Sequence, residues 1–361
     1  MKRLRLAFLL AFMLAASLAI PAWAEEPLIN IELNYWLPRL AGESESPVGL
    51  MYDAYNDDNH PYLDQWVYLK LDPQPFWGIK ASADIKLSGG KLGIDYLQTG
   101  ASASFGSLDD PFDEDDFNPR TFDDMYFYGI EAWNDFWEWE PGYYDLDWNY
   151  LYGSKSVSLM SAGLHYTAPL IVDGTTQIDW RMGLKGLKLT ESSSLIIREV
   201  DPDSEDAPEY YCQHASDVSQ SIMAGGPMLG VSCTRRLTPA LNLHAGVDIA
   251  ALMGSVTDEG EFRYYDYYTY NIDLEEWEYQ ESWYIDSYTE SALTLLPALD
   301  VNVGVSYAIS KVFTIKAGVF ATALPSVPSP REWSEWHEQW MKMPSRLVGA
   351  VGFTVGAKAS F

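Results

Sequence analysis

The sequence predicts an all-β fold, a transmembrane antiparallel β-barrel of about ten strands, with about twelve as the alternative. Three observations predict it: a two-residue alternation of apolar and polar side chains, connections that fall into two length classes, and a last strand that ends on an aromatic residue. Alternation places one set of side chains toward lipid and the other toward the lumen. No stretch after Glu25 has the roughly 18 apolar residues that a membrane helix needs.

The last strand shows the alternation best. Val351, Phe353 and Val355 share one face, Thr354 and Lys358 share the other, and the chain ends on Phe361. A terminal strand that closes on Phe resembles the carboxy-terminal signature by which the barrel-assembly machinery recognises its clients. We therefore expect Phe361 to be an assembly signal.

Nine further segments repeat the pattern with the same period. The predicted strands cover 29–35, 77–87, 92–96, 146–166, 178–184, 219–234, 241–251, 299–307, 313–319 and 347–361. The segment 219–234 is the least regular, because Gly225, Gly226 and Pro227 interrupt it and Pro in a strand marks a bulge or an edge.

The connections alternate between short and long. Short ones are expected at 88–91, 168–175, 235–240 and 308–312, and long ones at 37–73, 102–143, 190–218, 255–290 and 323–345. Outer-membrane barrels have short periplasmic turns and long external loops. An additional hairpin in the first or second long loop would make twelve strands.

The amino terminus predicts export. Basic residues at 2, 3 and 5 precede an apolar run over 6–20, and Ala22 and Ala24 form a cleavage site. We expect a signal peptide over 1–24 and one barrel domain over 25–361, in the outer membrane of a Gram-negative bacterium.

The inward face of the predicted strands carries balanced charges. The lumen-lining candidates are Glu32, Asp84, Asp95, Asp179, Asp248 and Asp300, the bases Lys80, Lys86, Arg181, Lys185, Lys316 and Lys358, and His244. Either these groups pair across a filled lumen, because an unpaired buried ion is costly, or they line a narrow water-filled channel.

The predicted loops hold most of the acid of a chain whose net charge is −29. Asp113, Glu114, Asp115 and Asp116 are weak candidates for a Ca²⁺ or Mg²⁺ site, since they lack the Gly of an EF-hand turn. The alternative is a solvated acidic loop whose aromatic residues pack over the mouth or onto sugar chains. Either way we expect an electronegative outer mouth and no nucleic-acid partner.

The last long loop is expected to hold a short helix. Ser329-Pro330-Arg331-Glu332 is a capping box with Pro at the first helical position, and tryptophans follow at 333, 336 and 340. Such a helix would fold over the mouth.

Catalysis finds little support. The five histidines belong to no recognisable triad or metal motif, and no nucleotide-binding loop is present. Asp57-Asp58-Asn59-His60 loosely resembles the Asp and His residues of omptin-type surface proteases. We expect no enzyme and no cofactor.

The middle of the chain resembles the Legionella-type major outer membrane protein family. Gly225-Gly226-Pro227-Met228-Leu229-Gly230 is similar to that family's G-x-G-P-x-x-G strand, 176–189 with its Asp179–Leu184 core is similar to its R-x-G-L segment, and 144–151 occupies the position of the long strand before it. The resemblance implies a pore-forming or adhesin-like surface protein.

The sequence therefore favours a porin-like protein that passes small cationic or neutral solutes. The alternatives are a surface interaction barrel with a plugged lumen and, less favoured, an omptin-like protease. The expected partners are outer-membrane lipid, lipopolysaccharide, the assembly machinery and small solutes, and homo-oligomerisation stays open.

Overall fold

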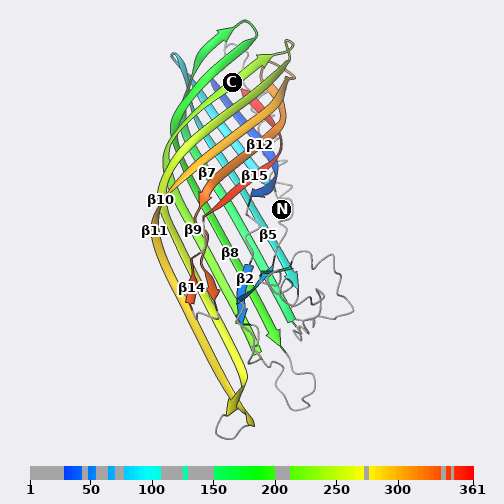
Figure 1. Ribbon diagram of the computed structural model, residues 1–361. Helices are drawn as coiled ribbons and strands as arrows, with labels where there is room; N and C mark the ends of the chain where they lie inside the picture. Colours follow the sequence, from blue (N-terminus) through cyan, green and yellow to red (C-terminus); the bar gives the residue numbers. More distant parts are fainter. Residues whose placement is uncertain are drawn as a thin grey trace, which may run out of the picture.

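The computed structural model describes residues 28–42, 48–53, 64–69, 77–106, 125–128, 150–199, 212–271, 276–334, 339–342 and 345–361. Its main body is a closed barrel of ten antiparallel strands in the order β1-β15-β12-β11-β10-β9-β8-β7-β5-β4, which confirms the predicted fold class and strand number (Figure 1). The barrel strands are β1 (Ile29–Gly42), β4 (Gly78–Leu87), β5 (Gly90–Gly106), β7 (Tyr150–Asp173), β8 (Thr176–Glu199), β9 (Cys212–Arg236), β10 (Leu241–Asn271), β11 (Glu276–Ala308), β12 (Phe313–Val327) and β15 (Arg346–Ser360).

The first and last strands close the ring. Ile31 lies opposite Ala359, and the pairing continues in register along the strand to Gly42, opposite Val348. The Phe361 amide donates to the Ile29 carbonyl, and the Phe361 carbonyl accepts from Leu28. The start of β1 and the end of β15 therefore lie at the end that carries the short turns, which is the upper end in Figure 1. We call this the turn end and the opposite one the far end.

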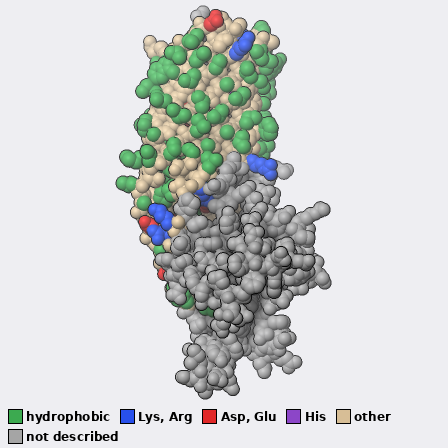
Figure 2. Space-filling view, in the orientation of Figure 1, with side chains coloured by type: hydrophobic (Ala, Val, Ile, Leu, Met, Phe, Trp, Pro, Cys, Tyr) green, Lys and Arg blue, Asp and Glu red, His purple; other side chains and the backbone are tan. Residues whose placement is uncertain are grey.

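The outer face has an apolar band that begins at the turn end. Large apolar side chains point outward from all ten strands, among them Leu184, Met223, Met253, Leu293 and Phe353. On the face that Figure 2 shows, hydrophobic side chains cover the upper part of the wall, and charged groups lie at its margins. Such a band between polar margins is what a lipid-facing barrel wall needs.

Beyond the band, toward the far end, the outer face carries Ser and Thr side chains. Ser156 pairs with Ser192 across β7 and β8, and Thr257 pairs with Ser291 across β10 and β11. The strands go on well past this level: β10 has 31 residues and β11 has 33, whereas a bilayer crossing takes about 9–11. The barrel wall thus projects beyond the membrane at the far end.

This projection corrects the predicted loop at 255–290. Residues 255–271 continue β10, and residues 276–290 belong to β11, paired with it. The connection predicted at 190–218 is likewise shorter, because β8 runs to Glu199 and β9 begins at Cys212. Their acidic and aromatic side chains made these segments look like loops, but a wall in water tolerates polar side chains on both faces.

The prediction of a helix near Ser329 is also wrong. Residues there form the short strands β13 (Glu332–Ser334) and β14 (Gln339–Met341), which pair with each other. They belong to a second sheet of order β14-β13-β2-β3-β6, with β2 (Val48–Asp53), β3 (Asp64–Leu69) and β6 (Met125–Tyr128) drawn from the predicted loops 37–73 and 102–143. Pairing with distant strands outweighs the local capping signal.

Candidate functional site

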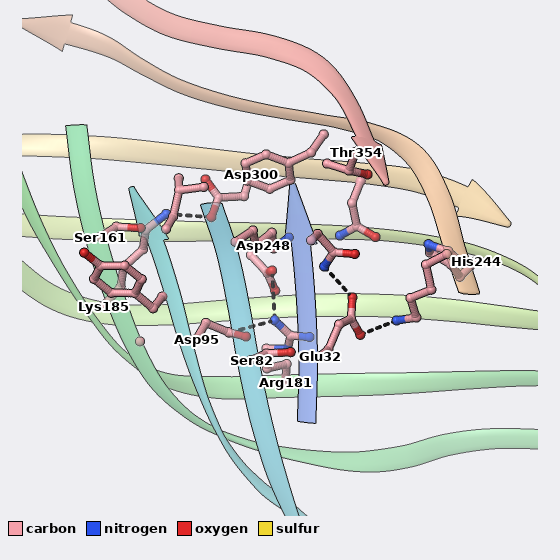
Figure 3. A pocket seen from close by; sticks show the side chains of 18 of the residues that line it. Glu32, Ser82, Asp95, Ser161, Arg181, Lys185, His244, Asp248, Asp300 and Thr354 are labelled. Atoms are coloured by element: carbon pink, nitrogen blue, oxygen red, sulfur yellow. Dashed lines mark hydrogen bonds and ion pairs between the residues drawn. The ribbon is translucent and has the colours of Figure 1, made fainter. Parts of the chain in front are cut away.

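The lumen near the turn end holds two adjoining polar cavities of about 170 Å³ and about 200 Å³. Their lining comes from inward positions of many strands, and Glu32, Asp95 and Arg181 line both. Figure 3 shows these side chains pointing toward one another across the lumen. The alternation seen in the sequence is what turns them inward.

Ion pairs cross this space in several directions. Arg181 Nη1 lies 3.2 Å from Asp248 Oδ2 and 3.5 Å from Asp95 Oδ2. Lys185 Nζ lies 2.6 Å from Asp300 Oδ2, and Lys316 pairs with Glu32. These contacts are drawn as dashed lines in Figure 3. The charges of this part of the lumen therefore neutralise one another.

Twelve of the thirteen lumen-lining candidates line one of the two cavities. The exception is Lys86, which is exposed beside the turn at 88–89. His165 and Lys91 also line the second of these cavities but were not among the candidates. His165 has the inward parity of β7, and its Nδ1 lies 3.1 Å from Asp95 Oδ2, so strand parity alone could have found it.

On the far side of the polar cavities an apolar plug fills the lumen. We use this name for the cluster of buried side chains that nine of the ten barrel strands contribute: Trp36, Leu97, Val157, Leu159, Leu187, Leu189, Ile222, Leu252, Val256, Leu296, Ala298, Phe320, Leu324, Val327, Val348 and Ala350. The tenth strand, β4, takes part through Gly78, where a Cβ would stand 2.9 Å from Trp36 Cε3. The plug is therefore continuous around the ring.

A second charged layer lies next to the plug on its far-end side. Glu191, 4% exposed, lies 2.9 Å from Lys155 Nζ and accepts a bidentate pair of bonds from Arg346, which is 3% exposed. Burial by itself would raise the pKa of the Glu191 carboxyl, but these two cations outweigh it and hold the pKa below its ordinary value. The sequence did not predict this cluster, because Glu191 fell in the predicted loop 190–218 and Arg346 lay between the predicted loop 323–345 and the predicted strand 347–361.

The same inner wall anchors the segment that follows β12. The Arg331 amide donates to Asp258 Oδ2 at 3.1 Å and to the Tyr288 hydroxyl at 3.2 Å, and the Arg331 guanidinium pairs with Glu290. The Trp340 ring centroid lies 4.6 Å from that of Tyr288. This segment thus reaches into the lumen from the far end.

Other sequence candidates lie outside the described residues. These are the signal peptide over 1–24, the acidic run Asp113–Asp116 and the Asp57–His60 cluster. Within the described part of the chain, no group of three or more His, Cys, Asp or Glu side chains is placed to hold a metal ion. The described residues include no helix long and apolar enough to span a bilayer.

Comparisons with known proteins return outer-membrane barrels. The OmpT outer membrane protease of Escherichia coli matches with a TM-score of 0.47 and 8% identity, over 96% of this chain and 100% of that one. A major outer membrane protein of Thermus thermophilus matches with a TM-score of 0.31 and 11% identity, over 92% and 99%. A FadL homologue of Pseudomonas aeruginosa gives 0.28 and 11%, over 96% and 94%. No protein-family model and no curated protein matches the sequence.

The closed ring, the lipid-facing band and the short turns at one end define the class of this protein as an outer-membrane β-barrel. At these TM-scores and identities, the comparisons add no particular activity to that class.

Proposed function

We propose that the protein is an outer-membrane barrel with a closed lumen that presents its projecting wall to partners at the cell surface. The observation that carries the proposal is the apolar plug, to which nine of the ten strands contribute. A hydrated ion or polar solute crossing this layer would lose its hydration without gaining a hydrogen-bonding partner, which is costly. The plugged interaction barrel is therefore favoured over the porin-like interpretation.

The projecting wall supplies the surface for interaction. Its strands are held by cross-strand pairing far beyond the bilayer, as far as Asn271 opposite Glu276. Its outer face carries exposed hydroxyl pairs and the ion pair of Arg263 with Asp217. A rigid, hydrophilic wall of this kind suits contact with envelope sugars or a protein partner better than passage of solutes.

Conductance in planar bilayers tests the proposal. We expect the purified protein to give no stepwise openings, because the plug closes the lumen. The double variant Trp36→Ala, Phe320→Ala removes the two rings that meet inside the plug and should open a measurable pathway. Phe353→Ala, which removes a ring from the lipid face, is the matched control and should stay silent. Stepwise openings of the unaltered protein would overturn the proposal and favour a porin.

The remaining sequence predictions belong with this proposal. We infer that the protein is exported with a cleaved signal peptide and has no enzymatic activity, and peptide cleavage lost on His60→Ala would contradict the latter. Kinship with the Legionella-type major outer membrane proteins rests on the segment Gly225–Gly230 and stays a prediction.

A further inference from the structure

A row of polar side chains crosses the inner wall on the far-end side of the plug. Glu191 on β8 lies opposite Gln220 on β9, Gln220 lies opposite Asp258 on β10, and Asp258 lies opposite Glu290 on β11. Side chains directly opposite each other in antiparallel strands have Cβ atoms about 4.5–5.5 Å apart. The row therefore brings three carboxylates and one amide together on a single inner surface.

The two outer members of the row form salt bridges, whereas the described residues give the two middle members none, and Arg331 acts on Asp258 through its amide and its more distant charge. Glu191 is paired with Lys155 and Arg346, and Glu290 is paired with Arg331. Among the described residues, Asp258 makes no ion pair, and its Oδ1 atom has no hydrogen-bond partner. Both amide atoms of Gln220 likewise lack a partner within the described part of the chain.

Burial makes these missing partners costly. Gln220 is 3% exposed and Asp258 is 8% exposed. A buried polar atom without a hydrogen bond costs about 1–3 kcal/mol, and more when it is charged. The same burial raises the pKa of the Asp258 carboxyl above its ordinary value, because the bonds from Tyr288 and the Arg331 amide only partly offset it.

Aromatic rings bound the same spot. Gly260 is the next inward position on β10 after Asp258, and a Cβ there would stand 2.7 Å from Trp340 Cη2 and would overlap Tyr288 Cε1. The glycine thus lets both rings lie against the wall beside the carboxylate. Carboxylate and amide oxygens beside aromatic faces are the surroundings that bind organic cations.

We propose that Gln220 and Asp258 form a binding site for a primary ammonium group of a small organic cation. The ammonium would donate to Asp258 Oδ1 and Gln220 Oε1, and the alkyl part would lie against Trp340 and Tyr288. This inference rests on the proposed function in one respect, since it places the ligand on the far-end side of a closed plug. Because the unpartnered atoms are enclosed, neighbouring side chains have to move for the ligand to enter.

Three probes of similar size test this chemistry by isothermal titration calorimetry on the purified barrel in neutral detergent, at about 0.15 M salt to screen exposed charges. Butylammonium should bind. Tetramethylammonium, a cation without N–H donors, and butanol, which has no charge, should bind at least tenfold more weakly. Equal binding of butylammonium and tetramethylammonium, or no binding of butylammonium at all, would overturn the proposal and leave water as the occupant.

Variants then locate the site. Asp258→Asn should weaken butylammonium binding at least tenfold, and Gln220→Leu several-fold. Glu259→Gln removes a charge from the adjacent outward position on β10 and should leave binding unchanged. An equal loss with Glu259→Gln would mean general attraction to an acidic surface and would contradict the site. If Asp258→Asn does not assemble, Gln220→Leu and the three-probe comparison decide the matter.

The two proposals fail separately. If the barrel does not conduct and binds no butylammonium, only the proposed binding site is wrong. If the barrel conducts and binds butylammonium at Asp258, only the proposed closure of the lumen is wrong.

Discussion

Trp36 on β1 and Phe320 on β12 meet edge to face within the lumen, with ring centroids 5.1 Å apart. Lys80 Nζ lies 3.9 Å from the centroid of the same Phe320 ring, at the edge of the polar cavity. Phe320 therefore marks the boundary between the charged lumen near the turn end and the apolar plug. The two layers interlock there, since Thr322, the next inward residue of β12, donates to Asp300 at 2.8 Å.

Phe320→Ala should destabilise the barrel by about 3–5 kcal/mol, because it leaves a cavity in a packed interior. Urea unfolding in lipid vesicles measures the loss. Phe353, which is 69% exposed on the outer face, offers the matched control, and Phe353→Ala should cost clearly less. Equal losses for the two variants would mean that the plug is loosely packed.

Lys185→Met should destabilise the barrel by about 3 kcal/mol, because it leaves the Asp300 carboxylate without its cation in a confined lumen. Adding Asp300→Leu should recover most of the loss, since the pair is then replaced by apolar side chains. The double-mutant cycle is measured by unfolding in vesicles. If the losses in stability of the two single variants add up to the loss of the double variant, Lys185 and Asp300 are not energetically coupled despite their 2.6 Å contact.

Glu191→Gln should cost about 3–5 kcal/mol at neutral pH, because the buried cations Lys155 and Arg346 lose the carboxylate that bridges them. The pKa of Glu191 is lowered from 4.5 in the folded protein, so its stabilising contribution is present above that ordinary value and is lost as pH falls through the lowered folded value. The stability gap between the two proteins should therefore close progressively below pH 4.5. If the difference in unfolding free energy between the two proteins stays constant even at a pH where Glu191 is protonated, the ion pairs of Glu191 do not account for it.

Gly260→Ala should displace Trp340 from the inner wall, because the added methyl would stand 2.7 Å from Trp340 Cη2. We expect a red-shifted emission component that disappears when Trp340→Phe is added. The control is Gly225→Ala on β9, where the nearest atom to an added Cβ is 3.6 Å away, and its emission should match that of the unaltered protein. Identical spectra for both variants would mean that Trp340 is not seated at Gly260.

Phe361→Ser should lower the amount of heat-modifiable barrel in cells several-fold while leaving refolding of the purified chain nearly unchanged. The backbone bonds of residue 361 to Leu28 and Ile29 survive the substitution, so the loss would reflect recognition during assembly rather than stability. Unchanged cellular levels would remove Phe361 as an assembly signal, and failed refolding would give it a structural role instead.

The alternation in the sequence predicted the ten strands and the side from which each side chain projects. Glu32, Arg181 and Asp300 could be placed in the lumen from parity alone, because successive side chains of a strand point to opposite faces. The same rule places His165 in the lumen, because it has the inward parity of β7. These features depend on neighbours along the chain.

Which inward residues meet depends on the register of strands that are distant in sequence, and that only the tertiary structure decided. Glu191 and Arg346 are 155 positions apart, yet they form a bidentate pair. Strand register likewise determines the plug and the row from Glu191 to Glu290. It also determines how β10 and β11 continue beyond the bilayer. A wall bathed in water on both faces has no lipid side to enforce alternation, so its sequence looks like a loop until cross-strand hydrogen bonds show that it is a sheet.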